Sequence, residues 1–393
     1  MPKIFRKITR AFIPTRLSTQ VRELYSSTVM MNFAVSLVNI FEPVFIFGLF
    51  IKNHDLGASL SYLLYFYLAV YIPYFFFVPL GAKFAKRFGY EYSIALSTIF
   101  LIGIYLFLYF GERSVWYLAL AAVSYVLQKA FYWPAYHFNF CRFSHGSDRG
   151  REISNLSALI SLVFILGPLV GGWLLELYDF SVLFLVASIL ILASNVPMLL
   201  TKEKFKPTKF PYLAAIKRVF ARQNRRFFWA SIGYGEELIL LVIWPVFIYR
   251  VVTDYLQLGV LTSLATAVTT VIFLFIGRFA DKMNRRGIIR ISGIFYALSW
   301  FLRLLSRSIL GVFLLDSFSR VAKQAISIPI TAMVYDEARE SSVSEVIVFY
   351  EMALVAGKII AMVLCLILLQ FFAPGWNAMF MLAGLMTFLY LLF

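Results

Sequence analysis

Residues 277–286 read GRFADKMNRR, and they separate two long apolar stretches of the chain. Five of these ten residues are charged, and four of the five are Lys or Arg. We therefore expect a short aqueous loop between two membrane-spanning helices. Short loops rich in Lys and Arg remain on the cytoplasmic side of a membrane, so this loop predicts an orientation as well as a boundary.

The composition of the whole chain agrees with a membrane location. Of its 393 residues, 61% are hydrophobic and 14% are charged, whereas soluble domains contain about 25% charged residues. A spanning helix needs about 20 mainly apolar residues. Twelve such runs occur, at 24–51, 60–82, 91–110, 114–138, 152–177, 181–201, 227–252, 256–277, 287–306, 308–334, 343–372 and 375–393. The sequence thus predicts an all-α membrane protein with an even number of spans.

Positive charges are concentrated in alternate loops. Of 36 Lys and Arg residues, 27 lie in the N-terminal tail or in loops on the same side as residues 277–286, and four lie in the opposite loops. This asymmetry predicts a multi-pass protein of the plasma membrane with both termini in the cytoplasm. The net charge of +16 also fits nucleic-acid binding, but only residues 202–226 offer a basic face outside the membrane. Contact with anionic lipid is the ordinary role of such a stretch, so we expect no nucleic-acid partner.

The two halves of the chain share short patterns in the same order. The pattern EPVFIF at 42–47 recurs as WPVFIY at 244–249, and QKA at 128–130 recurs as KQA at 323–325. The loop at 81–89 corresponds to residues 277–286. Such similarity is typical of parallel six-helix repeats. We predict a basic tail at 1–22, either an interfacial helix or a frayed end. The tail is followed by a first bundle at 23–201, a cytoplasmic linker at 202–226 and a second bundle at 227–393.

The spacing of the opening loop resembles the signature G-x-x-x-D-[RK]-x-G-[RK]-[RK] of the major facilitator superfamily of secondary transporters. The matching residues are Gly277, Asp281, Lys282, Arg285 and Arg286. Asn284 replaces a Gly, and this departure is mild because Asn is the non-Gly residue that most readily takes a left-handed backbone. The resemblance implies twelve helices in two pseudo-symmetric bundles, a monomer without a cofactor, and an alternating-access mechanism.

The resemblance also implies contacts that close the cytoplasmic side. In the family, the acid of this loop meets the N-terminal end of a helix from the other bundle, where the helix dipole favours an anion. Asp281 would therefore lie near Arg151. In the first half, Lys86, followed by Arg87, stands where the acid is expected. We predict a reversed pair between Lys86 and one of four acids: Asp336, Glu337, Glu340 or Glu345.

A small-residue motif occupies the fifth predicted span. It consists of Gly167, Pro168, Gly171 and Gly172, and it resembles the core of a motif found in exporter branches of the superfamily. Ordinary close packing of helices explains it equally well. The upstream part of that motif is missing, and the fourth span lacks the Arg that many proton-coupled exporters carry. Both departures argue against a drug antiporter.

Ten charged residues fall inside the predicted spans, where each costs about 2.5–3.5 kcal/mol at the bilayer centre. They are Glu42, Lys129, Glu236, Glu237, Arg303, Asp316, Arg320, Lys323, Glu351 and Lys358. The resemblance places spans 1, 4, 7 and 10 around a central cavity and so brings seven of these residues there. Arg303, Glu351 and Lys358 fall on spans that are peripheral in the family, and for them we expect structural ion pairs.

Helical spacing groups some of these residues. Asp316, Arg320 and Lys323 share one face of a helix, Lys129 and Tyr132 share another, and Asn39 belongs to a polar stripe that ends at Glu42. We predict that Lys129, with Arg320 or Lys323, holds the anionic or hydrogen-bonding part of a solute. Because burial favours the neutral form of a carboxyl group, Glu42, Glu236 or Glu237 would carry a coupled proton. Alternatively, these charges are salt bridges that hold the bundles together.

The predicted function is proton-coupled transport of a small anionic or amphipathic solute, with export ranked ahead of uptake. The alternatives are efflux of hydrophobic drugs, an uptake permease, and a receptor or scaffold that does not transport. The sequence contains no H-E-x-x-H, no G-x-S-x-G and no phosphate-binding Gly loop, and its three His residues are scattered. We therefore predict neither an enzyme nor a metal site.

Overall fold

The computed structural model describes residues 19–143, 149–200, 205–208, 210–280, 284–306, 308–372 and 374–393, and its regular elements within these ranges are all helical. The first half contains α2 (Thr19–Val38), α3 (Glu42–Ile51), α4 (Leu56–Phe88), α5 (Tyr90–Tyr109), α6 (Val115–Phe143), α7 (Arg149–Leu177) and α8 (Phe180–Leu200). The second half contains α10 (Arg225–Ile232), α11 (Gly235–Leu238), α12 (Trp244–Val252), α13 (Tyr255–Ala280), α14 (Arg285–Leu302), α15 (Ile309–Glu340), α16 (Val343–Phe371) and α17 (Trp376–Thr387). Helix α9 (Tyr212–Phe220) lies between the halves.

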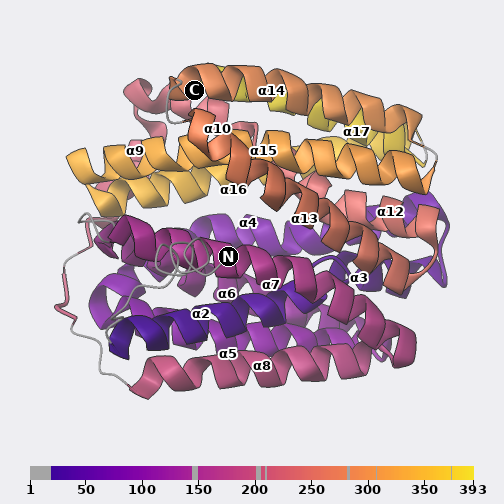
Figure 1. The fold of residues 1–393 in the computed structure, drawn as a ribbon, viewed down its shortest axis with the longest axis horizontal. Helices are drawn as coiled ribbons and strands as arrows, with labels where there is room; N and C mark the ends of the chain where they lie inside the picture. The colour runs from indigo at the N-terminus through magenta and orange to yellow at the C-terminus, as the bar shows by residue number, and fades with distance from the viewer. Residues whose placement is uncertain are drawn as a thin grey trace, which may run out of the picture.

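The helices form two bundles whose long axes are roughly parallel. The first half, indigo to magenta, occupies the lower part of Figure 1, and the second half, orange to yellow, occupies the upper part. Helices α4, α6 and α15 end, and α16 begins, at the end of the molecule that carries α9. We call this the α9 end; the sequence predicts it to be cytoplasmic. Helices α3 and α12 lie at the opposite end.

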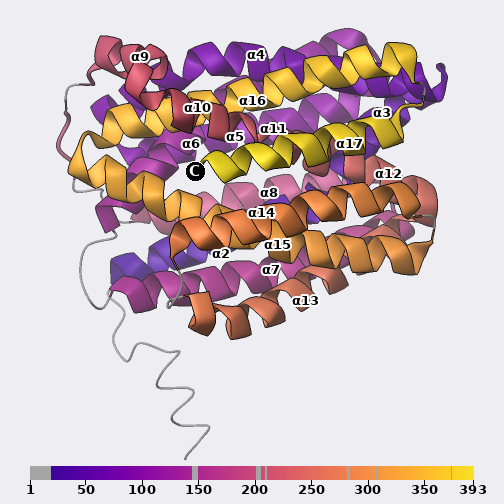
Figure 2. The ribbon, with the colours of Figure 1, turned by 90° about the horizontal axis from the view of Figure 1, so that it is seen from above.

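The bundles meet along two seams. Helix α4 packs against α16, and α7 packs against α13, on opposite sides of the interface (Figure 2). At the second seam Gly172 faces the start of α13, where a Cβ on Gly172 would lie 2.7 Å from the Tyr255 carbonyl oxygen. Small residues therefore let the two backbones approach closely at this seam.

Both halves contain a broken helix at the repeated Pro-Val-Phe-Ile pattern. Helix α2 ends at Val38, and α3 begins at Glu42 with Pro43 in its first turn. In the second half a π-helical turn at Ile239–Ile243 leads into α12, which has Pro245 in its first turn. Proline lacks the N–H that would continue the preceding helix. The repeat thus marks the same interruption in the first and seventh predicted spans.

Eight helical segments are long and apolar enough to cross a membrane, within the residues that the structure describes. A shorter apolar segment, Trp376–Leu392, covers the last predicted span. The predicted spans 114–138, 227–252 and 308–334 fall on α6, on α10 to α12, and on α15. Intramembrane charges lower the mean hydropathy of these three spans. The π-helical turn also divides the span 227–252 into shorter helices. All twelve predicted runs therefore coincide with helix, although eight qualify as spans by length and composition.

The polar linker contains a helix that the sequence did not predict. Helix α9 packs against α16, with Ala215 and Val219 buried. Arg218 of α9 pairs with Glu337, and its Nη1 lies 3.9 Å from Glu345 Oε2. The linker is therefore attached to the second bundle. Most of the predicted tail at 1–22 lies outside the described residues.

Close packing of α4 on α6 leads to a first prediction. A Cβ on Gly81 would collide with the Ala130 carbonyl group, whereas a Cβ on Gly48 of α3 meets no atom within 4 Å. We expect Gly81→Ala to lower the free energy of unfolding by about 1–3 kcal/mol. Gly48→Ala should leave it unchanged or raise it by about 0.5–1 kcal/mol. Thermal unfolding in detergent measures both, and equal unfolding temperatures for the two variants would contradict the predicted collision.

Candidate functional site

A buried carboxylate lies at the break between α2 and α3. Glu42 Oε1 accepts hydrogen bonds from the hydroxyls of Tyr67 on α4, at 3.0 Å, and Tyr125 on α6. Glu42 is 8% exposed. No cation among the described residues lies within ion-pair distance of it. Two phenols from the first bundle therefore supply its hydrogen bonds.

Lys129 lies one turn beyond Tyr125 on α6. Its Nζ is 5.4 Å from the centroid of the Tyr125 ring and 5.3 Å from that of Tyr71. Among the described residues no carboxylate lies within 4.0 Å of Nζ, although Glu42 lies within reach of its field. Aromatic faces attract a cation but do not neutralise it. Among the described residues Lys129 therefore has no carboxylate in direct contact, although Glu42 and Glu237 lie in its field.

The second bundle brings an ion pair to the same place. Glu237 of α11 and Lys358 of α16 are 2.7 Å apart, and Lys358 Nζ lies 5.6 Å from the centroid of the Tyr71 ring. Lysines from both bundles thus contact one tyrosine. Glu237 also lies in the fields of Lys129 and Lys323. Lys129, Lys323 and Lys358 therefore all lie within electrostatic reach of Glu237, and Lys358 is its direct partner.

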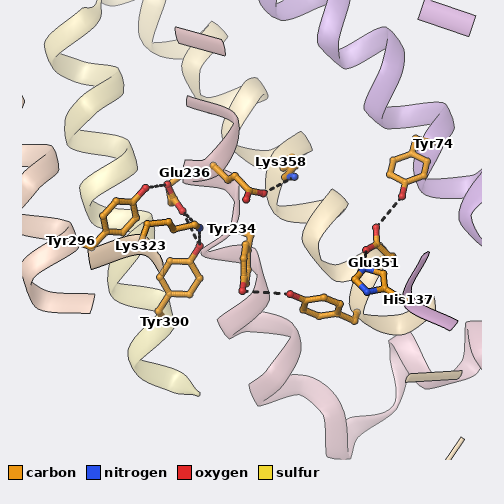
Figure 3. Close-up of polar contacts among 11 residues, drawn as sticks. Tyr74, His137, Tyr234, Glu236, Tyr296, Lys323, Glu351, Lys358 and Tyr390 are labelled. Atoms are coloured by element: carbon orange, nitrogen blue, oxygen red, sulfur yellow. Dashed lines mark hydrogen bonds and ion pairs between the residues drawn. The ribbon is translucent and has the colours of Figure 1, made fainter. Parts of the chain in front are cut away.

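Lys323 is enclosed within the second bundle. It pairs with Glu236, which is fully buried, and Figure 3 shows both beside Tyr296 and Tyr390. Tyr296 donates to Glu236 Oε2 at 2.5 Å, and Tyr390 donates to Oε1 at 2.8 Å. The Tyr234 ring lies 4.5 Å from Nζ. Because its charge is matched and its donors are occupied, this cluster has the features of a structural ion pair.

Arg320 and Asp316 form another pair in the second bundle. Arg320 Nε lies 2.6 Å from Asp316 Oδ2, and Trp244 donates to Oδ1 at 2.8 Å. Arg303 is buried between the Trp244 and Trp300 rings, 4.1 and 3.8 Å from their centroids. Arg303 also donates to the Ser319 hydroxyl at 2.7 Å but forms no ion pair among the described residues, so its structural role stays a prediction.

A small cavity between the bundles contains two of the predicted residues. Its volume is about 80 Å³, and Asn39 and Arg320 line it from different bundles. Ser36, Thr262 and Thr266 add hydroxyl groups to the wall. This volume holds a few water molecules or one small functional group of a solute. The predicted Tyr132 lies elsewhere on α6, stacked on Tyr136 at 5.7 Å between ring centroids.

A fourth polar cluster joins the bundles near the α9 end (Figure 3). Glu351 of α16 accepts a hydrogen bond from Tyr74 of α4 at 2.9 Å and lies 2.9 Å from His137 Nε2 of α6. The other His137 nitrogen is 2.7 Å from the Tyr335 hydroxyl of α15. The expectation that Glu351 and Lys358 are peripheral is therefore wrong, because α16 forms a seam with α4 and both side chains contact first-bundle residues.

Comparison with known proteins assigns the fold to a family. The family model described as Major Facilitator Superfamily matches residues 24–249 and 227–393. The chain belongs to the Major Facilitator Superfamily. It is therefore a multi-pass membrane protein of a transporter family, as its sequence signature predicts.

Individual relatives are distant in sequence. Uncharacterized protein YqgE of Bacillus subtilis (strain 168) is 24% identical over 310 residues, which are 74% of this chain and 70% of that protein. A crystal structure of a D-xylose-proton symporter superposes with a TM-score of 0.68 and 13% identity, covering 93% of this chain and 96% of that one. A POT family transporter in complex with 5-aminolevulinic acid gives 0.69 and 13%, covering 94% of each chain. These solved structures share the fold.

The loop signature of the superfamily is partly visible in the structure. Asp281, Lys282 and the side chain of Arg151 lie outside the described residues. The predicted contact between Asp281 and Arg151 therefore stays a prediction. Gly277 lies in α13, and Arg285 Nη1 is 2.5 Å from Asp336 Oδ2. Asn284 accepts a hydrogen bond from the backbone N–H of Arg286, and its backbone is extended, with φ −63° and ψ 128°. Asn284 acts as the N-cap of α14, a role that asparagine performs well.

The predicted pair of Lys86 is wrong for the described residues. Lys86 Nζ lies 5.6 Å from the Tyr90 ring centroid and 4.8 Å from that of Phe138, while Arg87 lies over Phe88. Gly89, at φ 121°, turns the chain so that α5 begins at Tyr90 and brings this ring back to Lys86. Three of the four candidate acids instead meet Arg residues, namely Glu337 and Glu345 with Arg218, and Asp336 with Arg285.

The small-residue motif of α7 packs on two neighbours. Cβ atoms on Gly167 and Gly171 would collide with Ser36 and Leu37 of α2. Gly172 faces α13, and the Pro168 carbonyl lies against Gly259 of α13. These four residues therefore let α7 pack closely on α2 in its own bundle and on α13 in the second bundle.

Sequence reasoning missed His137, Tyr71 and Tyr74 as site residues. Each lies on a helix with many aromatic residues, where nothing in the spacing distinguishes it from lipid-facing neighbours. His137 follows Lys129 by eight residues, which places the two on similar faces of α6. This spacing from Lys129 is the one feature of the sequence that could have identified His137 as a site residue.

Proposed function

We propose that this protein transports a small organic solute that carries an anionic group, that transport is coupled to protons, and that it occurs by alternating access between the two bundles. The observation that carries the proposal is Lys129, whose ammonium contacts two aromatic rings and has no carboxylate within ion-pair distance among the described residues. An intramembrane cation is costly unless an anion accompanies it. An anionic solute supplies that anion.

The position of Lys129 supports this role. It lies on α6 in the first bundle, and the Tyr71 ring that it contacts is also contacted by Lys358 of the second bundle. A solute bound here touches both bundles, so its binding energy can depend on their relative position. A ligand shifts a conformational equilibrium only through such differential contacts.

Glu42 is our candidate for the proton-coupling group. Glu236, Glu237 and Asp316 each have a cation within ion-pair distance, but Glu42 has two phenol donors and the more distant field of Lys129. When Glu42 is protonated, it no longer competes for Lys129, and Lys129 binds a solute anion more strongly. By linkage, the solute then favours protonation of Glu42 by the same factor. This arrangement favours co-transport of proton and anion over the export ranked first from the sequence.

One structural relative supports the proposed coupling ion, and another supports a solute that carries a carboxylate. One is named as a D-xylose-proton symporter, and another was crystallised with 5-aminolevulinic acid, a small zwitterion that carries a carboxylate. At 13% identity both show only that this fold accommodates such transport.

The test uses purified protein in liposomes that contain a pH-sensitive dye. A panel of carboxylates, zwitterions, neutral sugars and cationic amphiphiles is added outside under an inward proton gradient. We expect one or more carboxylate-bearing solutes to acidify the interior only when the protein is present. Acidification by neutral or cationic solutes alone, or by none of the panel, would reject an anion–proton symporter. Reversal of the gradient tests the exporter alternative, because protons then leave the liposomes and an antiporter would take up the external solute in exchange.

Glu42→Gln should separate solute movement from proton movement. Gln retains an oxygen that accepts hydrogen bonds from Tyr67 and Tyr125, but it cannot release a proton. We expect uphill accumulation to fall at least about tenfold, while exchange of labelled for unlabelled solute continues within about threefold of wild type. Glu112→Gln, at an exposed ion pair with Lys52, is the matched control and should behave as wild type. Normal accumulation by Glu42→Gln would assign coupling to another carboxylate.

A further inference from the structure

The polar cluster at the α9 end has a property that the clusters around Glu42, Glu236 and Asp316 lack. Its four side chains come from two helices of each bundle: Tyr74 of α4, His137 of α6, Tyr335 of α15 and Glu351 of α16. His137 and Glu351 are buried, with side chains 9% and 7% exposed. The cluster therefore bridges the interface along which the bundles must separate.

Other ion pairs do not cross this interface in the part of the chain that the structure describes. Those of Glu236, Glu237, Asp316 and Asp336 lie within the second bundle, and Lys52 pairs with Glu112 within the first. Arg218 attaches the linker helix to the second bundle. The contact of His137 with Glu351 is the one described ion pair between the bundles. Any opening at the α9 end breaks it.

We propose that His137 and Glu351 form a second proton-binding site, distinct from Glu42, and that the proton held there keeps the α9 end closed. This inference rests on the proposed alternating-access function, because it assigns a role to one of the two end states. The ligand is a proton, and histidine is the side chain whose charge ordinarily changes between about pH 5 and pH 8.

The contacts of His137 accommodate both of its protonation states. In the neutral ring, Nε2–H donates to Glu351 and Nδ1 accepts from the Tyr335 hydroxyl. In the charged ring both nitrogens donate, and the Tyr335 oxygen accepts. The atoms need not move, but protonation places a positive charge on the donor, so the hydrogen bond to the Glu351 carboxylate becomes an ion pair between the bundles. Lower pH therefore favours closure at the α9 end, and this preference is lost as His137 deprotonates.

Neighbouring groups do not provide a competing switch in this pH range. The titratable and charged groups that face the pair are Tyr74 of α4, Tyr136 and Cys141 of α6, Tyr335 of α15, and Tyr350 and Lys358 of α16. Phenols and thiols are ordinarily neutral between pH 5 and about pH 8, and an ammonium is ordinarily charged. Histidine is thus the one side-chain type in this cluster whose charge ordinarily changes in this range.

Opening the α9 end exposes the site to the solution on that side. Separation of α6 and α16 removes the carboxylate from His137 and admits water, so the imidazole loses the partner that stabilises its charged form. The proton is then released to that solution. Closing the end re-forms the buried pair and favours protonation again. The site thus exchanges its proton with the solution on that side each time the α9 end opens and closes.

The test measures the opening of the α9 end without any solute. Spin labels at Lys83→Cys on α4 and Glu340→Cys on α15, which are exposed positions in opposite bundles, report the distance across this end. The buried Cys141 and Cys365 are replaced with Ala. Distance distributions are recorded between about pH 5 and pH 8. In the otherwise wild-type protein we expect the ratio of open to closed populations to rise about tenfold with pH.

Variants at the pair distinguish a switch from general pH sensitivity. His137→Gln keeps a donor for Glu351 and an acceptor for Tyr335 but cannot become charged, so its ratio should change less than twofold and match wild type at high pH. Glu351→Gln should also lose the pH response. His54→Gln, at an exposed position, is the matched histidine control and should respond as wild type. A tenfold response that persists in His137→Gln would overturn the proposal. Because no solute is needed, this result is independent of whether the liposome assay succeeds.

Discussion

Lys129→Ala is expected to reduce solute transport by about 100-fold or more, because it removes the cation that we assign to the anionic group of the solute. Losing one partner of a buried charge pair costs about 2–5 kcal/mol, and about 2.7 kcal/mol corresponds to 100-fold. The folded protein should remain, since Lys129 has no ion pair to break among the described residues. Uptake and exchange in liposomes measure the loss, and the size-exclusion profile in detergent measures folding.

Two companion variants define the role of the charge. Lys52→Ala removes a lysine whose side chain is 62% exposed in its pair with Glu112, and it should transport at the wild-type rate. Lys129→Arg keeps the charge and should retain more transport than Lys129→Ala, at a changed apparent affinity, because a planar guanidinium binds carboxylates differently from an ammonium. Transport by Lys129→Ala within twofold of wild type would exclude Lys129 as the anion-binding residue.

Lys323→Ala is expected to lose folded protein rather than transport alone. Removing Lys323 leaves Glu236 fully buried with two phenol donors and no cation in contact. Breaking a buried pair on one side costs about 3–5 kcal/mol, a large part of the about 5–15 kcal/mol that stabilises a typical folded protein. The yield of monodisperse protein after detergent extraction, and its unfolding temperature, should both fall.

A double variant separates the structural role of this pair from a transport role. Glu236→Gln combined with Lys323→Met removes both charges, keeps an acceptor for Tyr296 and Tyr390, and fills the space of the lysine stem. Replacing a buried ion pair in this way is often neutral for stability, so both yield and transport should recover. A Lys323→Ala protein that folds as wild type but does not transport would restore the solute-binding role predicted from the sequence.

These two lysines illustrate which part of the site the sequence could predict. Lys129 lies in the QKA pattern and Lys323 in the KQA pattern of the internal repeat, so the sequence predicts the same role for both. The structure separates them, because α11 and α14 bring Glu236 and Tyr296 to Lys323, while α4 brings only the Tyr71 ring to Lys129. Two residues with the same local pattern therefore have different partners.

The errors at Lys86, Glu351 and Lys358 have a related cause. Each was placed by analogy with the position of its loop or helix in the family, which does not determine where a side chain points. Lys86 packs on the aromatic rings of Tyr90 and Phe138, and Glu351 and Lys358 face α4 and α6 across the interface. A rotation of α16 by a fraction of a turn would direct these side chains to lipid or to other helices. The sequence of α16 does not specify that rotation.

The sequence by itself determined the class of this protein, the twelve apolar runs that coincide with helix, and its superfamily. These features depend on local composition: apolar length and charge in short loops. Only the tertiary structure decided that Lys129 remains unmatched among the described residues, that Lys323 is neutralised, and that His137 and Glu351 connect the bundles. Such partners depend on how each helix is rotated and shifted against its neighbours. The packing of the whole chain sets that arrangement, and no local pattern records it.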